Sequence, residues 1–170
     1  AESSVTLFDA LRALEAAARD ERIKGIYLNF TGGGAADVTI LEELREAITH
    51  FKESGKFVVS YADVYSQWVY YLSSVADKVY MQPEGTFSFT GLSISTMFYK
   101  GLIDKLGVEV DILRPTVCKY KSAVEPFFLD KMSDANRAQM QAMADGMWGV
   151  LTEAVSASRG ISVEELNRLA

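Results

Sequence analysis

The chain has 170 residues, of which 49% are apolar and 24% are charged, a balance that is ordinary for a globular protein with a core of its own. Its formal net charge of −6 argues against nucleic-acid binding, because phosphate contacts need a surplus of Lys and Arg and the lysines here are scattered singly. One cysteine, Cys118, excludes an internal disulfide, and one histidine, His50, leaves too few ligands for a zinc site.

No cofactor is expected from these residue counts. The sequence contains no run of about 18 apolar residues that would span a membrane, and no signal peptide is visible. The abrupt opening, Ala-Glu-Ser-Ser, and a capping-box pattern of Ser162 and Glu165 near the other end lead us to expect a segment cut from a longer protein. That expectation leaves open whether the parent protein carries a membrane anchor.

Hydrophobic periodicity predicts helices that alternate with strands along the chain. Helices are expected at residues 5–19, 38–54, 65–75, 94–106 and 134–158. Strands are expected at residues 23–30, 57–61, 78–81 and 108–113, with a brief strand or loop at 85–91. This order predicts an α/β fold with a mainly parallel sheet flanked by helices, in a single domain over residues 1–170. The last helix is long enough that it could pack on a neighbour.

Ligand sites in parallel sheets usually lie among the loops that leave the carboxyl ends of the strands. We therefore expect any chemistry in four loops, Thr31–Asp37, Ala62–Gln67, Gln82–Gly91 and Arg114–Ser122. The Gly32–Gly34 run in the first loop precedes a helix, where free amides can hold an anion or an oxyanion. It matches neither the dinucleotide pattern, which fails at Asp37, nor a phosphate-binding loop, so a plain turn is the alternative.

Ser66 lies at a strand-to-helix turn, where acyl-transfer enzymes place nucleophiles. A nucleophile elbow has glycines two residues to either side, whereas Val64 and Trp68 stand there. We therefore favour a helix-capping serine. His50 is interpreted as a surface or capping residue without a functional role, and the methionines at 140, 143 and 147 as packing residues.

Lys119 and Lys121 lie beside an apolar run just after a predicted strand. A lysine can act as a general base when it is uncharged, which requires a pKa about 3 units below the usual value near 10.4, and burial can supply such a shift. Residue type alone leaves the ordinary alternative, a solvated lysine, in place.

Residues Tyr120–Phe127 resemble the segment around the catalytic lysine in the long form of the signal peptide peptidase A (protease IV) family. Four further stretches resemble the same family in the same order. They are Val5–Asp9, Ile26–Phe30 with the glycines that follow, Tyr65–Leu72 and Asp130–Ser133. The likeness covers nearly the whole chain, and the lysine segment is its specific part.

The resemblance implies a membrane-anchored serine protease of the bacterial inner membrane that degrades cleaved signal peptides outside the cytoplasm. It implies a ClpP/crotonase-like fold and a Ser–Lys dyad divided between two fused halves, in oligomers that are typically tetramers. On this sequence, Lys121 takes the general-base role, and Lys119 should point elsewhere. The serine, and the partner surface that carries it, belong to the carboxyl-terminal half.

The chain departs from that family where the nucleophile would be expected. The family's serine motif reads roughly Ala-Ser-Gly-Gly-Tyr, whereas Ser66–Tyr70 here places Gln67 at the serine's position and has no glycine pair. A glutamine cannot be the nucleophile, so the segment alone is expected to be inactive. The Gly32–Gly34 run resembles the family's oxyanion loop, but its interpretation as a turn survives.

Two alternatives remain open at this stage. The chain could be a non-catalytic peptide-binding or oligomerisation module in which Lys121 is structural. It could also be a crotonase-like acyl-CoA enzyme, which would need a basic surface for the coenzyme phosphates, and the acidic balance weighs against that class.

Overall fold

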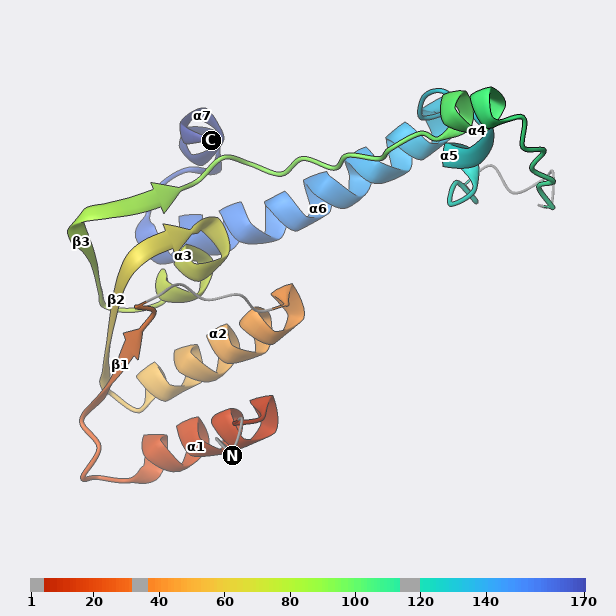
Figure 1. Ribbon diagram of the computed structural model, residues 1–170. Coiled ribbons are helices and arrows are strands. Elements are labelled where there is room, and N and C mark those ends of the chain that lie inside the picture. Colours follow the sequence, from red (N-terminus) through yellow and green to blue (C-terminus); the bar gives the residue numbers. More distant parts are fainter. Residues whose placement is uncertain (1–4, 32–36, 114–119) are drawn as a thin grey trace. The chain divides into compact units, whose positions relative to one another are not determined.

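A computed structural model describes residues 5–31, 37–113 and 120–170 of the chain (Figure 1). These residues fall into two compact units. The first comprises the chain up to Thr90 together with Leu151–Ala170, and the second comprises Gly91–Val150. The expectation of a single domain over residues 1–170 stays a prediction.

A parallel three-stranded sheet forms the centre of the first unit. Its strands are β1 (Gly25–Asn29), β2 (Phe57–Ser66) and β3 (Lys78–Ser88), in the order β1-β2-β3. Every second residue at the start of β2 is buried, namely Val58, Ser60 and Ala62, so one face of the sheet is covered. The predicted α/β class with a parallel sheet flanked by helices is confirmed.

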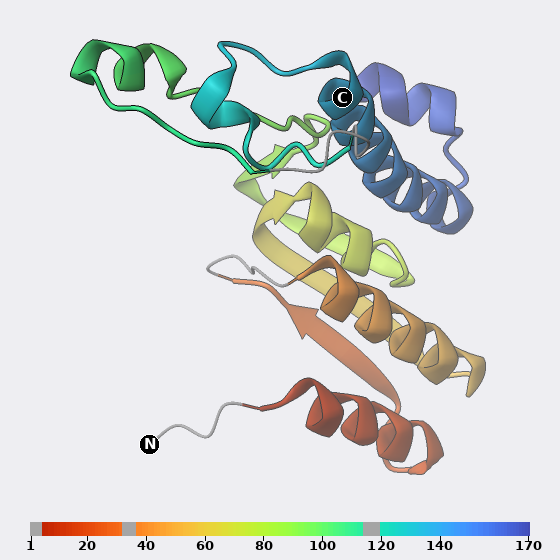
Figure 2. The same ribbon diagram turned by 90° about the vertical axis from the view of Figure 1, so that its right-hand side faces the viewer.

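Helices α1 (Leu7–Arg19), α2 (Val38–Glu53) and α3 (Gln67–Ser73) lie side by side next to the strands (Figures 1 and 2). The end of α6 (Asp134–Arg159) and α7 (Val163–Leu169) complete this unit. Side chains at helix starts accept the orphan backbone N–H groups, as Thr6, Asp37 and Ser162 do for α1, α2 and α7. Of the capping box predicted at Ser162 and Glu165, the serine half is confirmed, since Ser162 Oγ accepts from Glu165 N, whereas the Glu165 carboxylate pairs with Arg168.

Two strands are longer than the sequence predicts. Pairing between β2 and β3 is interrupted after Ala62 and resumes at Val64, so most of the expected loops 62–67 and 82–91 is strand. Gly85 permits the interruption, because a Cβ there would lie 2.3 Å from the carbonyl oxygen of Asp63. Periodicity cannot reveal such an insertion, since it shifts the alternation of buried and exposed residues.

The second unit contains α4 (Lys100–Leu106), α5 (Glu125–Phe128) and the first part of α6. The predicted helix at 94–106 is therefore too long, and α5 was not predicted. The predicted strand at 108–113 is wrong, because these residues form no ladder within the described chain. Val108, Val110 and Leu113 are exposed, and β-branched residues form a strand only where a second backbone pairs with them.

No helix in the described ranges is long and apolar enough to cross a membrane.

Arg45 joins three helices of the first unit through one guanidinium group. From α2 it donates to the backbone oxygen of Tyr71 and to Ser74 Oγ (2.8 Å) at the end of α3. It also donates to the backbone oxygen of Ala154 (3.0 Å) and to Ser158 Oγ on α6. The guanidinium carbon lies 4.9 Å from the centre of the Tyr71 ring. Burial lowers the pKa of Arg45, so this positive charge depends on the oxygens that surround it.

Replacing Arg45 with alanine is expected to lower the free energy of unfolding by about 2–4 kcal/mol, because four accepting oxygens lose their donor together. Urea unfolding followed by circular dichroism measures the change. Arg19→Ala is the matched control, since Arg19 pairs with Glu15 at the surface and its loss should change stability by less than about 1 kcal/mol. Equal effects for the two variants would contradict the role of Arg45.

Asp77, just before β3, contacts both the start of β2 and the end of α2. Its carboxylate accepts from Val58 N (2.7 Å) and pairs with Lys52 Nζ (2.8 Å). The hydrogen bond from Lys52, followed by the one from Val58 N, lowers the pKa of Asp77 below its ordinary value of 3.8. A carboxyl group with a lowered pKa stabilises the folded state above its ordinary pKa, and this contribution is lost as the pH falls through the lowered value.

The Asp77→Asn variant should therefore differ from the unaltered chain by a constant free energy of unfolding above about pH 5, and the gap should close as the pH falls below about 4. Unfolding by urea at a series of pH values measures the gap. Glu43→Gln, at an exposed position of α2, should show no such trend. A gap for Asp77→Asn that stays constant down to about pH 2 would refute the linkage.

Candidate functional site

Lys121 lies in the second unit, directly before a tight turn, Ser122–Glu125, that leads into α5. The backbone N–H of Glu125 donates to the carbonyl oxygen of Ser122 (2.9 Å) and closes the turn, and Leu129 N donates back to Glu125 O (2.9 Å). Pro126 stands in the first turn of α5, where its missing N–H costs nothing. The lysine is exposed, and so is Tyr120 before it.

An open hollow of about 530 Å³ borders the lysine. It is lined by Lys121 and its neighbours, by one residue of a preceding segment and by two residues of α6: Leu113, Tyr120, Lys121, Ser122, Ala123, Val124, Gln139 and Met140. The lysine thus shares a concave surface with apolar side chains and with the hydroxyl of Ser122. Cys118 and Lys119 lie outside the described residues.

Glu125 is 2% exposed and holds the lysine turn against the start of α6. Its carboxylate accepts from Ser133 Oγ (2.6 Å), Ser133 N (3.2 Å) and Asn136 Nδ2 (2.9 Å). The Ser133 hydroxyl in turn accepts from Asn136 N (3.2 Å), as an N-cap does. Asn136 Oδ1 is buried, and the described chain offers it no hydrogen-bond partner. We call Glu125, Ser133 and Asn136 the glutamate cluster.

Sequence analysis did not predict the glutamate cluster. Two features of the sequence could have indicated it: Glu125 stands beside Pro126 in an apolar run, and Ser133 comes just before the long helix predicted from residue 134. Further support for α5 comes from Tyr99, whose N–H donates to Pro126 O (2.7 Å) and whose ring stacks on Phe127 at 5.9 Å between centres. The backbone beside Lys121 is therefore fixed on two sides.

Ser66 is the N-cap of α3, as the sequence predicts. Its Oγ accepts from Val69 N (3.2 Å). Gln67, the first residue of the helix, is 9% exposed, and its Oε1 accepts from Thr90 N (3.4 Å). A buried glutamine that caps a backbone amide fills the place in which a nucleophile would need to be open to substrate.

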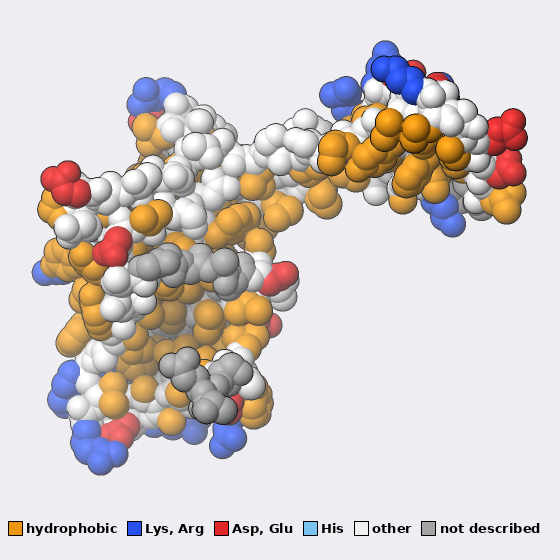
Figure 3. Space-filling model, viewed as in Figure 1, with side chains coloured by type: hydrophobic (Ala, Val, Ile, Leu, Met, Phe, Trp, Pro, Cys, Tyr) orange, Lys and Arg blue, Asp and Glu red, His pale blue; other side chains and the backbone are white. Residues whose placement is uncertain are grey.

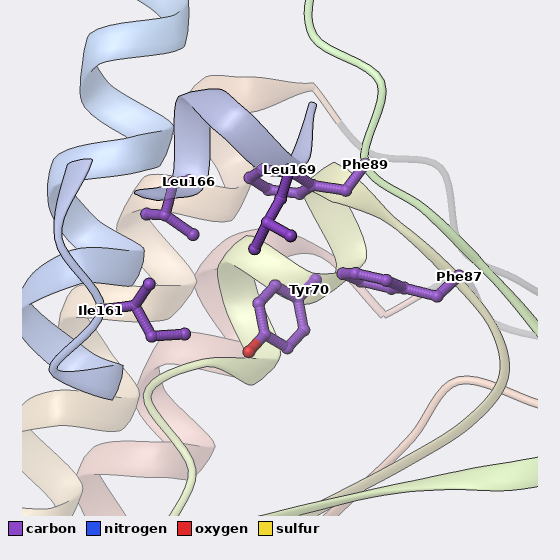
Figure 4. Close-up of a pocket in the computed structure, with 6 residues that line it drawn as sticks. All are labelled: Tyr70, Phe87, Phe89, Ile161, Leu166 and Leu169. Atoms are coloured by element: carbon purple, nitrogen blue, oxygen red, sulfur yellow. The ribbon is translucent and has the colours of Figure 1, made fainter. Parts of the chain in front are cut away.

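A second hollow, of about 270 Å³, lies in the first unit beyond the end of β3. Figure 4 shows the rings of Tyr70, Phe87 and Phe89 and the side chains of Ile161, Leu166 and Leu169 around it. The rings of Tyr70 and Phe87 meet edge to face at 5.1 Å between centres. This lining offers apolar contact and contains no base.

The remaining candidates contribute no chemistry to either hollow. His50 is exposed and lies 2.8 Å from Glu53, in agreement with the surface interpretation. Met140 lines the lysine hollow, whereas Met143 and Met147 are 49% and 36% exposed, so the packing expected of them is only partial. Figure 3 shows apolar side chains gathered on the visible face of the second unit. The Gly32–Gly34 run lies outside the described residues.

The chain is similar in sequence to known peptidases. The family model "Peptidase family S49" matches residues 50–170. Protease 4 of Haemophilus influenzae is 40% identical over 95% of this chain and 26% of its own length, and Protease 4 of Salmonella typhi is 39% identical over the same shares. The chloroplastic serine protease SPPA of Arabidopsis thaliana is 30% identical over 88% of the chain and 22% of its own length. The chain spans about a quarter of the length of these relatives.

Ser66→Ala is expected to lower the free energy of unfolding by about 1 kcal/mol, because α3 loses its N-cap. Any hydrolytic activity of the full-length protein should stay within about twofold when assayed well below the unfolding temperature, since a capping hydroxyl takes no part in the chemistry. Ser66→Asp should recover the stability, as aspartate also caps. A loss of activity that Ser66→Asp does not restore would indicate a chemical role for the hydroxyl.

Proposed function

This chain belongs to peptidase family S49, and on that premise we propose that it is the lysine-bearing, amino-terminal part of a serine endopeptidase. The ClpP/crotonase-like fold of that family agrees with the parallel sheet flanked by helices. The observation that carries the proposal is the place of Lys121, directly before a turn fixed by hydrogen bonds and at the edge of an open hollow.

The nucleophile of the proposed reaction comes from outside this chain. Gln67 is buried and accepts a backbone hydrogen bond, and the neighbouring Ser66 is spent on capping α3. Glutamine has no hydroxyl to attack a carbonyl, and the hydroxyl of Ser66 already accepts from Val69 N. We therefore assign the serine to the carboxyl-terminal half of the same protein, which would approach Lys121 at the hollow.

The proposed reaction follows the Ser–Lys form of serine-protease chemistry. Neutral Lys121 takes the proton of the serine hydroxyl while the serine oxygen attacks the scissile carbonyl carbon. The lysine then gives this proton to the departing amine, so the peptide bond breaks and an acyl-serine ester remains. Lys121 next accepts a proton from water, whose oxygen attacks the ester, and returns it to the serine oxygen. No further co-reactant is needed for the balance.

Cleaved signal peptides are the substrate class that we propose. Their apolar segments suit the apolar walls of the lysine hollow, from Leu113, Val124 and Met140. We further propose a homo-oligomer, a tetramer as in the family, that sits at the bacterial inner membrane with its catalytic part outside the cytoplasm. The printed name of the bacterial relatives, Protease 4, supports a peptidase.

Lys121→Ala in the full-length protein is expected to lower kcat for a peptide ester by on the order of 10³-fold or more, because the serine loses its general base. Lys119→Ala is the matched control and should retain activity. Circular dichroism checks that both variants fold. If the Lys121 variant turns over like the unaltered enzyme, the lysine is structural and the chain is better described as a peptide-binding module.

A further inference from the structure

The glutamate cluster connects the two walls of the lysine hollow directly. One wall is the turn Tyr120–Val124, which ends at Glu125, and the other is the second turn of α6, with Gln139 and Met140. The Glu125 carboxylate reaches across to the start of α6 through Ser133 and Asn136, by contacts of 2.6–3.2 Å. Any change in these contacts would therefore shift Lys121 relative to the opposite wall.

The burial of the cluster makes it a rigid link. Glu125 and Asn136 are 2% and 3% exposed, so water cannot replace their contacts at low cost. Three hydrogen bonds converge on the carboxyl group of Glu125 and reach both of its oxygens. A lysine side chain has four flexible bonds, so the position of its backbone must be held firmly if its amine is to meet a serine from another segment.

We infer that Glu125 is a positioning residue for Lys121: its carboxylate, held by Ser133 and Asn136, sets the distance between the lysine turn and α6 and so places the lysine amine for proton transfer. Glu125 acts through the backbone turn, since its N–H donates to Ser122 O, one residue beyond Lys121. This role rests on the proposed function of Lys121 as the base and adds a requirement for its placement.

The test uses the full-length protein and the variants Glu125→Ala, Glu125→Gln and Lys121→Ala. For Glu125→Ala we expect kcat for a peptide ester to fall by about 10- to 100-fold, as for a base displaced by about 1 Å, while KM changes by less than about threefold. Glu125→Gln keeps one accepting oxygen and should recover most of the loss. Glu109→Ala, at an exposed position of the same unit, should match the unaltered enzyme.

Hydrogen exchange measured by mass spectrometry tests the contacts of the glutamate cluster independently of activity. Exchange should accelerate in residues 120–129 and 133–137 of Glu125→Ala and stay unchanged in α1 and α2. If Glu125→Ala does not fold, Ser133→Ala provides the same readouts, since it removes one donor to the carboxylate and the cap of α6. Thermal unfolding confirms that each variant is folded at the assay temperature.

Unchanged exchange in residues 120–129, or faster exchange with kcat unaltered, would overturn the positioning role. A change confined to KM would also overturn it, because a displaced base slows chemistry and leaves substrate binding intact. Full activity of Lys121→Ala would sink the proposed function together with the positioning role. An inactive Lys121→Ala beside a fully active Glu125→Ala would sink the positioning role alone.

Discussion

A polar side chain that is withdrawn from water needs hydrogen-bonding partners, and each unit contains one such side chain, the partly buried Arg45 and the buried Glu125. In the first unit, Arg45 gathers oxygens from the ends of α3 and from α6. In the second, Glu125 gathers donors from the start of α6. In both cases the partners include groups at helix ends, where backbone atoms lack intrahelical partners and carry partial charge. The cost of leaving such a charge unsatisfied makes the geometry around it specific.

The two groups differ in what they hold in place. Arg45 fixes α2, α3 and α6 against one another, and α3 is the helix whose first turn contains Ser66 and Gln67. Glu125 closes the turn that directly follows Lys121. In the first unit, the strand-to-helix turn contains Ser66 and Gln67, whose side chains accept from Val69 N and Thr90 N. The second unit holds an accessible amine next to a hollow.

This division explains why a peptidase family member can lack a visible nucleophile. The hydroxyl of Ser66 accepts from Val69 N and so serves as the cap of α3. Likewise, Gln67 is buried and its Oε1 accepts from Thr90 N, so its side chain is not exposed for contact with a substrate. The lysine turn meets the opposite requirement, since its backbone is held by buried contacts while its side chain remains exposed.

The sequence by itself determined the helices α1, α2 and α6, the parallel sheet and the cap at Ser66, because these depend on local periodicity and on side chains within four residues. The prediction of Lys121 as a site residue came from the resemblance of a specific segment, and it stays a prediction. Only the tertiary structure decided that residues 108–113 form no strand, that β2 and β3 pair again beyond Gly85, and that Glu125 meets Ser133 and Asn136. Each of these depends on a partner supplied by a distant or bulged part of the backbone, and neither residue type nor spacing encodes which partner will be present.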